Sequence, residues 1–188
     1  MKIVGLVGTK VGWSTKTAMN NIKTILERKY ENEQVDIIDL ADYDVEFSDG
    51  RNYLDYTGDT QTVVRTLMEA DIIIITTPVF QASIPGTLKN IFDLLPMDAF
   101  EGKTVGIMVV AGSSKHYLVA EQQLKPILNF MKAQLVQSYV FAEQKDIVKG
   151  EIMNQDVLLR IDRLIDVIMQ THNAFNKIKE LQNQMYDF

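Results

Sequence analysis

The chain has 188 residues, 46% of them apolar, and carries 19 Lys and Arg against 25 Asp and Glu, for a formal net charge of −6. At roughly 150 residues per domain, this length predicts a single domain, 1–188, and the negative charge argues against a protein that binds nucleic acid by neutralising phosphates. The absence of cysteine excludes disulfides, thiolate nucleophiles and thiolate metal ligands, and two histidines are too few for a His-rich zinc centre.

The first part of the chain alternates short apolar runs with helical patterns. Lys2–Val7 is a short apolar run that ends at Gly8, which is typical of a buried parallel strand and not of a signal peptide. Ser14 then predicts the N-cap of a helix, because apolar residues follow it at helical spacing. The next elements are a strand, a long surface loop and a helix, at Gln34–Leu40, 41–59 and Thr60–Ala70.

The second part opens with the most apolar strand, Ile72–Thr76, which Pro78 ends. Pro126 lies inside a helical pattern at Tyr117–Ala133, and because proline lacks an N–H group it predicts a kink or a break there. The remaining elements are a helix with proline in its first turn, two strands and a long C-terminal helix, at Pro85–Pro96, Lys103–Val110, Leu135–Phe141 and from about 154.

Five strands that alternate with five helices predict an α/β fold, a doubly wound five-stranded parallel sheet with helices on both faces. Uninterrupted apolar stretches such as Ile72–Ile75 are far shorter than a membrane span. We therefore expect a soluble, cytoplasmic protein. Residues 30–59 hold ten acidic residues and one basic residue, Arg51, so this segment has a charge of −9 and the rest of the chain +3. We expect a solvated acidic face there.

Ligands of doubly wound folds bind outside the carboxyl ends of the strands. This rule selects three loops, Gly8–Thr17, Thr77–Pro85 and Ala111–His116. The first loop combines two glycines, Ser and Thr hydroxyls and a helix start, and its only charges are Lys10 and Lys16, so it predicts a phosphate site. The alternative is an ordinary turn before a well-capped helix.

The first loop has neither the Walker spacing nor G-x-G-x-x-G, because its glycines fall at 5, 8 and 12. Asp39, at the end of the second strand, gives only weak support for a dinucleotide ribose. In the second loop, Phe80 either forms an aromatic wall beside a flat heterocycle or packs in the core. In the third, Lys115 and His116 either lie near a cofactor or point to solvent.

The second loop and its helix carry a long motif. It resembles P-x-Y-N-x-S-x-P-G-x-L-K-N of the NADPH-dependent FMN reductase family, flavodoxin-like enzymes that include azobenzene and quinone reductases. Phe80 stands for the tyrosine and Gln81 for the asparagine. The matching residues, in order, are Pro78, Ser83, Pro85, Gly86, Leu88, Lys89 and Asn90.

The first loop is similar to the family's G-S-x-R-x-x-S-x-N motif. Gly8, Thr9 and Ser14 match it, whereas Val11 stands at the arginine and Lys16 at the asparagine. The resemblance implies FMN with its phosphate on the first loop and its ring against the second and third. The implied cofactor-binding residues are Thr9, Lys10, Ser14, Thr15, Lys16, Thr17, Pro78, Val79, Phe80, Gln81, Ser83, Ala111, Gly112 and Ser113.

The resemblance also implies the reaction. A hydride passes from NAD(P)H to FMN, NAD(P)⁺ leaves, and a flavin, quinone, azo or nitro acceptor takes its place in a ping-pong cycle. The cofactor supplies this chemistry, so we assign no catalytic residue and no metal. Members are usually dimers or tetramers, which implies a homodimer or homotetramer. The sequence contains no motif that is specific for the 2′-phosphate of NADPH.

Three alternatives stay open. A flavodoxin-type electron carrier would use the acidic 30–59 segment to dock a basic partner, although its T/S-x-T-G-x-T loop differs from GTKVGWST. The others are a binding module that has lost its flavin and a Rossmann domain, which the glycine spacing disfavours.

The last helix has apolar residues at close to heptad spacing. Either its first half packs on the sheet and the rest frays, or it forms an arm on a partner subunit.

Overall fold

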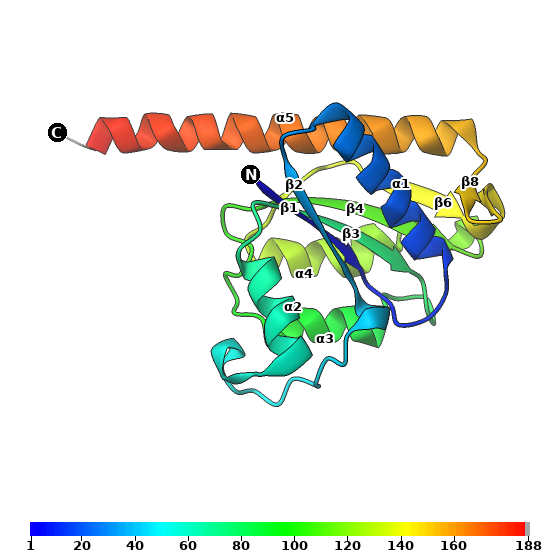
Figure 1. Ribbon diagram of the computed structural model, residues 1–188, viewed down its shortest axis with the longest axis horizontal. Helices are drawn as coiled ribbons and strands as arrows, with labels where there is room; N and C mark the ends of the chain where they lie inside the picture. Colours follow the sequence, from blue (N-terminus) through cyan, green and yellow to red (C-terminus); the bar gives the residue numbers. More distant parts are fainter. Residues whose placement is uncertain (187–188) are drawn as a thin grey trace.

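The computed structural model describes residues 1–186 and shows a parallel sheet with helices on both faces (Figure 1). The strands lie in the order β2-β1-β3-β4, and β5 and β6 both pair with β4, so the sheet is five positions wide. This is the predicted doubly wound fold in its flavodoxin-like order. The strands are β1 Lys2–Val7, β2 Gln34–Asp39, β3 Ile72–Pro78, β4 Thr104–Ala111, β5 Gln134–Leu135 and β6 Val140–Glu143.

The three central strands, β1, β3 and β4, are buried along almost their whole length. Because helices cover both faces of the sheet, the side chains on each face are shielded from water. This is why the strands are continuous apolar runs. Val7 pairs with Thr76, and Thr76 pairs with Met108, so the three strands run in register. Their carboxyl ends therefore meet at one edge of the sheet.

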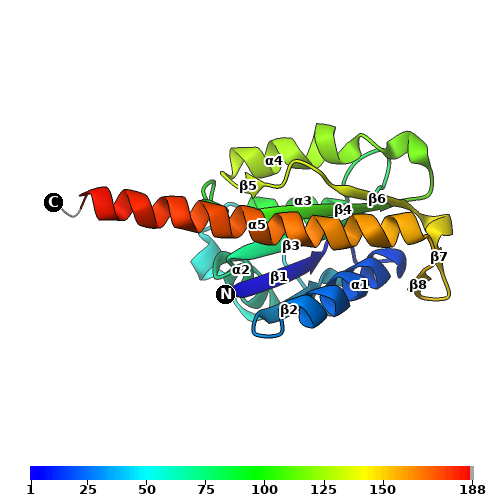
Figure 2. The same cartoon turned by 90° about the horizontal axis from the view of Figure 1, so that it is seen from above.

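Helices cover both faces of the sheet (Figures 1 and 2). The helices on each face enclose a separate apolar core, one including Ile22 and Ile161 and the other including Leu67 and Leu88. The first face carries α1 (Ser14–Lys29) and α5 (Gln155–Tyr186), and the second carries α2 (Gly58–Met68), α3 (Gly86–Leu94) and α4 (Lys125–Phe130).

The first half of α5 packs tightly on β4 because Gly106 lies beneath it. A Cβ added at Gly106 would collide with the fully buried side chain of Ile168. Beyond His172 the helix is mostly exposed, and Figure 2 shows that its C-terminal part projects past the sheet. Within residues 1–186, no helix is both long enough and apolar enough to cross a lipid bilayer.

The prediction of a single fifth strand at Leu135–Phe141 is wrong, because residues 136–139 interrupt it between β5 and β6. Lys125 Nζ donates to the carbonyl of Gln137 at 2.5 Å, so this backbone bonds a side chain instead of continuing the ladder. A short hairpin of β7 (Ile147–Val148) and β8 (Glu151–Ile152) follows, which is too short to leave a pattern in the sequence.

The predicted kink or break at Pro126 takes the form of a change of helix type, and the helix is not interrupted there. A π-helical segment at Ala120–Leu124 precedes α4, and Pro126 lies in the first turn of α4. At that position its missing N–H costs no helical hydrogen bond.

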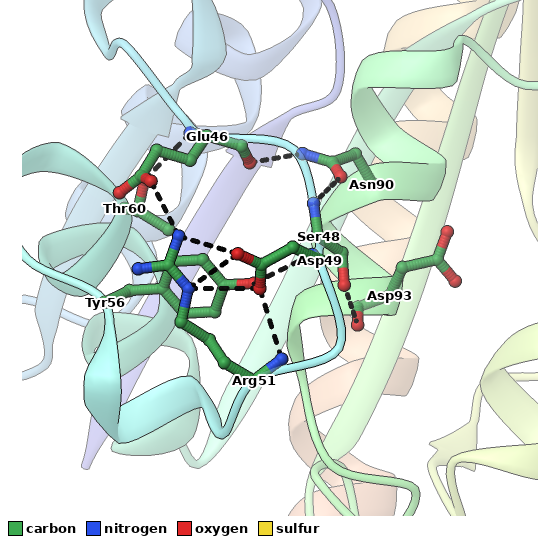
Figure 3. Close-up of polar contacts among 8 residues, drawn as sticks. All are labelled: Glu46, Ser48, Asp49, Arg51, Tyr56, Thr60, Asn90 and Asp93. Atoms are coloured by element: carbon green, nitrogen blue, oxygen red, sulfur yellow. Dashed lines mark hydrogen bonds and ion pairs between the residues drawn. The ribbon is translucent and has the colours of Figure 1, made fainter.

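Residues 43–57 cross α2 and α3 as a long loop that hydrogen bonds hold in place (Figure 3). Asn90 of α3 accepts from the N–H of Ser48 and donates to the carbonyl of Glu46, both at 2.9 Å. Thr60 of α2 accepts from the N–H of Glu46 at 2.9 Å. Asn90, the last residue of the long motif, therefore anchors this loop.

Arg51 is the single basic residue of the acidic segment, and it forms ion pairs with two of its acidic residues (Figure 3). Its guanidinium lies 3.0 Å from Glu46 and 2.9 Å from Asp49, and its Cζ is 4.2 Å from the centre of the Tyr56 ring. Hydrogen bonds from Arg51 lower the pKa of Asp49 to about 2. The acidic segment is thus internally paired at this point as well as solvated.

We expect Asn90→Ala to lower the free energy of unfolding by about 2 kcal/mol, because it leaves a backbone N–H and a carbonyl without their partners. Urea unfolding measures the change. Asn20→Ala, which removes an exposed amide from α1, is the matched control. Equal midpoints for the two variants would contradict the anchoring role.

His172 is a buried titratable group between α5 and the amino end of the sheet, with 5% of its surface exposed. Its Nε2 lies 2.8 Å from Asn176 Nδ2, and its Nδ1 lies 3.5 Å from Thr104 Oγ1. Burial lowers the pKa of His172, against the opposing charges of Asp71 and Glu33. The folded protein therefore holds this ring neutral.

Because the folded pKa lies below the unfolded value, this contribution to stability is complete above about pH 6.5. As the pH falls further, only the unfolded chain takes up the proton readily, and stability falls by up to about 1.4 kcal/mol per pH unit. Urea midpoints at pH 7.5 and 5.5 measure this slope. His172→Gln should flatten it, and an unchanged slope in that variant would assign the pH dependence to other groups.

Candidate cofactor site

The three loops predicted from the sequence meet at the carboxyl edge of the sheet, where a cleft of about 210 Å³ opens between them. Half of the predicted site residues line it directly. These are Ser14, Thr15, Pro78, Val79, Phe80, Ala111 and Gly112.

The first turn of α1 offers free backbone donors beside this cleft. Trp13 is the N-cap, no side chain caps the helix, and Ser14 is already helical, so the predicted capping role of Ser14 is wrong. Within residues 1–186, the N–H groups of Ser14, Thr15 and Lys16 have no hydrogen-bond acceptor, as the first N–H groups of a helix lack partners within it. No acidic residue lies in this turn. Such donors favour an anion.

The turn before α1 is fixed by Thr9 and Gly12. The Thr9 hydroxyl accepts from the N–H of Val11 at 3.2 Å and donates to its carbonyl at 3.0 Å. Gly12 has φ 89°, a left-handed conformation that glycine adopts without strain. Thr9 and Thr17 are buried and do not line the cleft, so they can only shape the loop from behind.

The two lysines of this loop pair with the acidic segment. Lys16 Nζ lies 2.7 Å from Asp39 and 3.7 Å from Asp42, and Lys10 Nζ lies 3.6 Å from Asp44. The hydrogen bond to Asp39, together with its charge, raises the pKa of Lys16. Neither lysine lines the cleft, whereas Ser14 and Thr15, whose N–H groups have no acceptor within residues 1–186, do.

The second loop is a strained two-residue turn. Gln81 and Ala82 have φ 48° and 60°, and the N–H and carbonyl groups of Phe80 and Ser83 bond each other at 3.0 Å. A left-handed conformation costs a non-glycine residue of the order of 1–2 kcal/mol, and such strain concentrates at functional sites. Phe80 is 41% exposed and lines the cleft, which excludes the alternative that it packs in the core.

The third loop leaves open space beside the cleft. A Cβ added at Gly112 would meet no atom within 4 Å, so a ligand can approach the backbone there. The Ser113 hydroxyl accepts from the N–H of Lys115 at 3.3 Å and caps a short 3₁₀ turn. Neither Lys115 nor His116 lines the cleft.

Four further residues line the cleft that sequence reasoning did not assign to it. Gln144 is the most informative, because it follows β6 and therefore reaches the same edge by the rule that selected the other loops. The predicted fifth strand ended at Phe141, whereas β6 ends at Glu143, so Gln144 was not predicted to lie at this edge. The four residues are Val11, Gly12, Val110 and Gln144.

Comparison with known proteins agrees with this geometry. The sequence model of the family described as NADPH-dependent FMN reductase matches residues 1–146. An NAD(P)H-dependent FAD/FMN reductase of Geobacillus thermodenitrificans is 40% identical over 175 residues, covering 92% of this chain and 94% of that protein. An FMN reductase (NADPH) of Escherichia coli is 38% identical over 88 residues, 47% of this chain and 46% of that protein.

Among solved structures, an oxidoreductase from Corynebacterium diphtheriae superposes with a TM-score of 0.74 and 25% identity, covering 93% of this chain and 98% of that chain. The family match spans both motif loops of the cleft. The chain therefore belongs to the NADPH-dependent FMN reductase family of oxidoreductases.

Proposed function

We propose that the protein is an FMN-dependent NAD(P)H oxidoreductase that passes electrons from NAD(P)H through bound FMN to a flat conjugated acceptor. The observation that carries this proposal is one juxtaposition. The free N–H groups at the start of α1 open onto a cleft walled by Phe80 and Gly112. A phosphate fits the donors, and a flat ring fits between the walls.

Each loop has a part in holding FMN. Ser14 and Thr15 donate hydroxyl and N–H groups to its phosphate, and within residues 1–186 these hydroxyls make no other hydrogen bond. Pro78, Val79 and Phe80 lie along one side of the ring, with Ala111 and Gly112 on another. The residues set back from the cleft support these contacts. They are Thr9, Lys10, Lys16 and Thr17 behind the phosphate, and Gln81, Ser83 and Ser113 behind the ring.

When bound, FMN supplies the redox chemistry, accepting a hydride from the nicotinamide and reducing the acceptor in a ping-pong cycle. The protein orients the reactants. Phe80 is 41% exposed, and Trp13, between the cleft residues Gly12 and Ser14, is 47% exposed. Exposed aromatic faces beside the cleft favour acceptors that stack. Flavins, quinones, azo compounds and nitroaromatics share that shape.

Trp13 is the only tryptophan of the chain, which makes it a reporter of this site. Titrating FMN into flavin-free protein should quench its fluorescence strongly and saturably, because bound FMN would lie close enough to accept its excitation energy. Adding NADPH or NADH without oxygen should then bleach the flavin absorbance. Fluorescence and absorbance spectroscopy on one sample measure both steps.

Ser14→Ala should weaken FMN binding about tenfold, since it removes one hydrogen bond to a charged group. Thr24→Ala, which deletes an exposed hydroxyl from the same helix, is the matched control and should bind as the unchanged protein does. Failure of FMN to quench Trp13 would overturn the flavin site. Bound FMN that neither nucleotide reduces would instead indicate an electron carrier.

We infer that the protein assembles as a homodimer or homotetramer in which the end of α5 contacts a second copy. His172 is the last buried residue of this helix among those whose burial is described. Ile178 and Leu181 beyond it are 54% and 53% exposed, on the part of the helix that projects from the domain (Figure 2). A helical segment with apolar side chains and little tertiary packing is marginal alone, which favours a covering partner.

Truncation after Asn176 should lower the mass measured by light scattering during gel filtration, because it removes the apolar arm and keeps the contact to His172. Ile178→Ser with Leu181→Ser should act in the same direction. Lys177→Ser, on the same exposed stretch, is the control and should leave the mass unchanged. An unaltered assembly in both arm variants would exclude the arm as the interface.

A further inference from the structure

A second concave surface lies beside the sheet, between the segment at 136–140 and α5. We name it the edge groove. Its volume is about 610 Å³, and its lining includes Tyr117, Tyr139, Arg160 and Arg163. No residue of the cofactor cleft belongs to it.

Two guanidinium groups line the edge groove, and the one that is not paired with an acid makes it cationic. Arg160 and Arg163 are three residues apart on α5, so they lie on the same side of the helix. Arg160 donates to the carbonyl of Phe141 at 3.0 Å, and its Nε lies 2.9 Å from Asp156. Arg163 is exposed and forms no ion pair or hydrogen bond with any residue from 1 to 186. One guanidinium is thus held in place, and the other is free to bind an anion.

The acid that lines the edge groove does not cancel this charge. Glu121 is bonded at 2.5 Å to the buried Lys125 Nζ, which also donates to the carbonyl of Gln137. That pair is neutral by itself. The exposed charge left for a ligand is therefore positive, in a protein whose net charge is −6.

The edge groove also has an aromatic wall. The rings of Tyr117 and Tyr139 have their centres 5.4 Å apart, and the Tyr139 hydroxyl donates to the carbonyl of Tyr117 at 2.5 Å. These contacts fix Tyr139, whereas Tyr117 is 50% exposed. An exposed tyrosine face beside arginines suits a purine base that bears a phosphate.

Tyr117 places the edge groove close to the cofactor cleft along the chain. It lies five residues after Gly112, so their Cα atoms are at most about 18 Å apart. That distance is within the span of an extended dinucleotide. With its nicotinamide in the cleft, the part of NADPH farthest from the reaction is the adenosine with its 2′-phosphate.

We propose that the edge groove binds this adenosine 2′-phosphate, with adenine on Tyr117 and the 2′-phosphate on Arg163. This inference rests on the proposed function, and it predicts a preference for NADPH over NADH. A phosphate monoester carries close to two negative charges, so a free guanidinium discriminates for it strongly. The sequence concealed this site because its arginines and tyrosines come from distant segments.

The test compares both nucleotides on the FMN-loaded protein. Arg163→Gln should lower kcat/KM for NADPH about tenfold, the loss expected for a charged hydrogen bond. It should change kcat/KM for NADH less than about twofold, since NADH lacks the 2′-phosphate. Arg65→Gln removes an arginine that is also exposed, from α2 on the opposite face of the sheet, and should alter neither value. Equal losses for both nucleotides, or no loss, would overturn the proposal.

Calorimetry separates this inference from the proposed function. The protein should bind 2′,5′-ADP saturably and more tightly than 5′-ADP, and Arg163→Gln should abolish the difference. If the flavin is reduced by neither nucleotide, the proposed function fails, and this binding result still decides the edge groove. Equal affinity for the two ligands, or no binding of either, would rule out a 2′-phosphate site.

Discussion

The burial of β1, β3 and β4 on both faces constrains the rest of the molecule. Their side chains are buried on both faces of the sheet. The connections between these parallel strands must therefore be helices that cover each face. Parallel strands with such crossovers bring all their carboxyl ends to one edge. Gly106 lets α5 approach the sheet closely enough to seal one face. The cofactor cleft follows from this packing, because it is the edge that the helices leave open.

Electrostatics is organised around the same edge. The acidic segment 30–59 carries −9 and packs beside the loop that begins α1. Lys10 and Lys16 pair with acids of that segment, which removes their charge from the cleft without adding an acid to it. The anion-favouring field at the cleft then comes from backbone N–H groups, whose positions are fixed by the helix and need no long side chain to be ordered. Val11, where the family has arginine, agrees with that arrangement.

Two of the four non-glycine residues with a left-handed conformation within residues 1–186 lie beside the cleft. Gln81 and Ala82 adopt left-handed conformations, and Trp13 and Phe80 expose aromatic surface that burial would stabilise. A sequence selected for stability alone would carry glycine at the first pair and polar residues at the second. Strain and exposed aromatic surface beside a cleft are expected where residues serve binding as well as folding.

The strand–helix alternation, the three loops that form the cleft and the motif that indicates the family could all be predicted from the sequence. Each depends on residues that are close together along the chain. Other features became visible only in the folded molecule: Ser14 is helical, Asn90 anchors the 43–57 loop, and Gln144 reaches the cleft. In addition, Lys125 bonds the backbone that interrupts the fifth strand, and both lysines of the first loop form ion pairs with acidic residues. These features depend on contacts between distant segments, and side-chain hydrogen bonds of that kind leave no periodic pattern in a sequence.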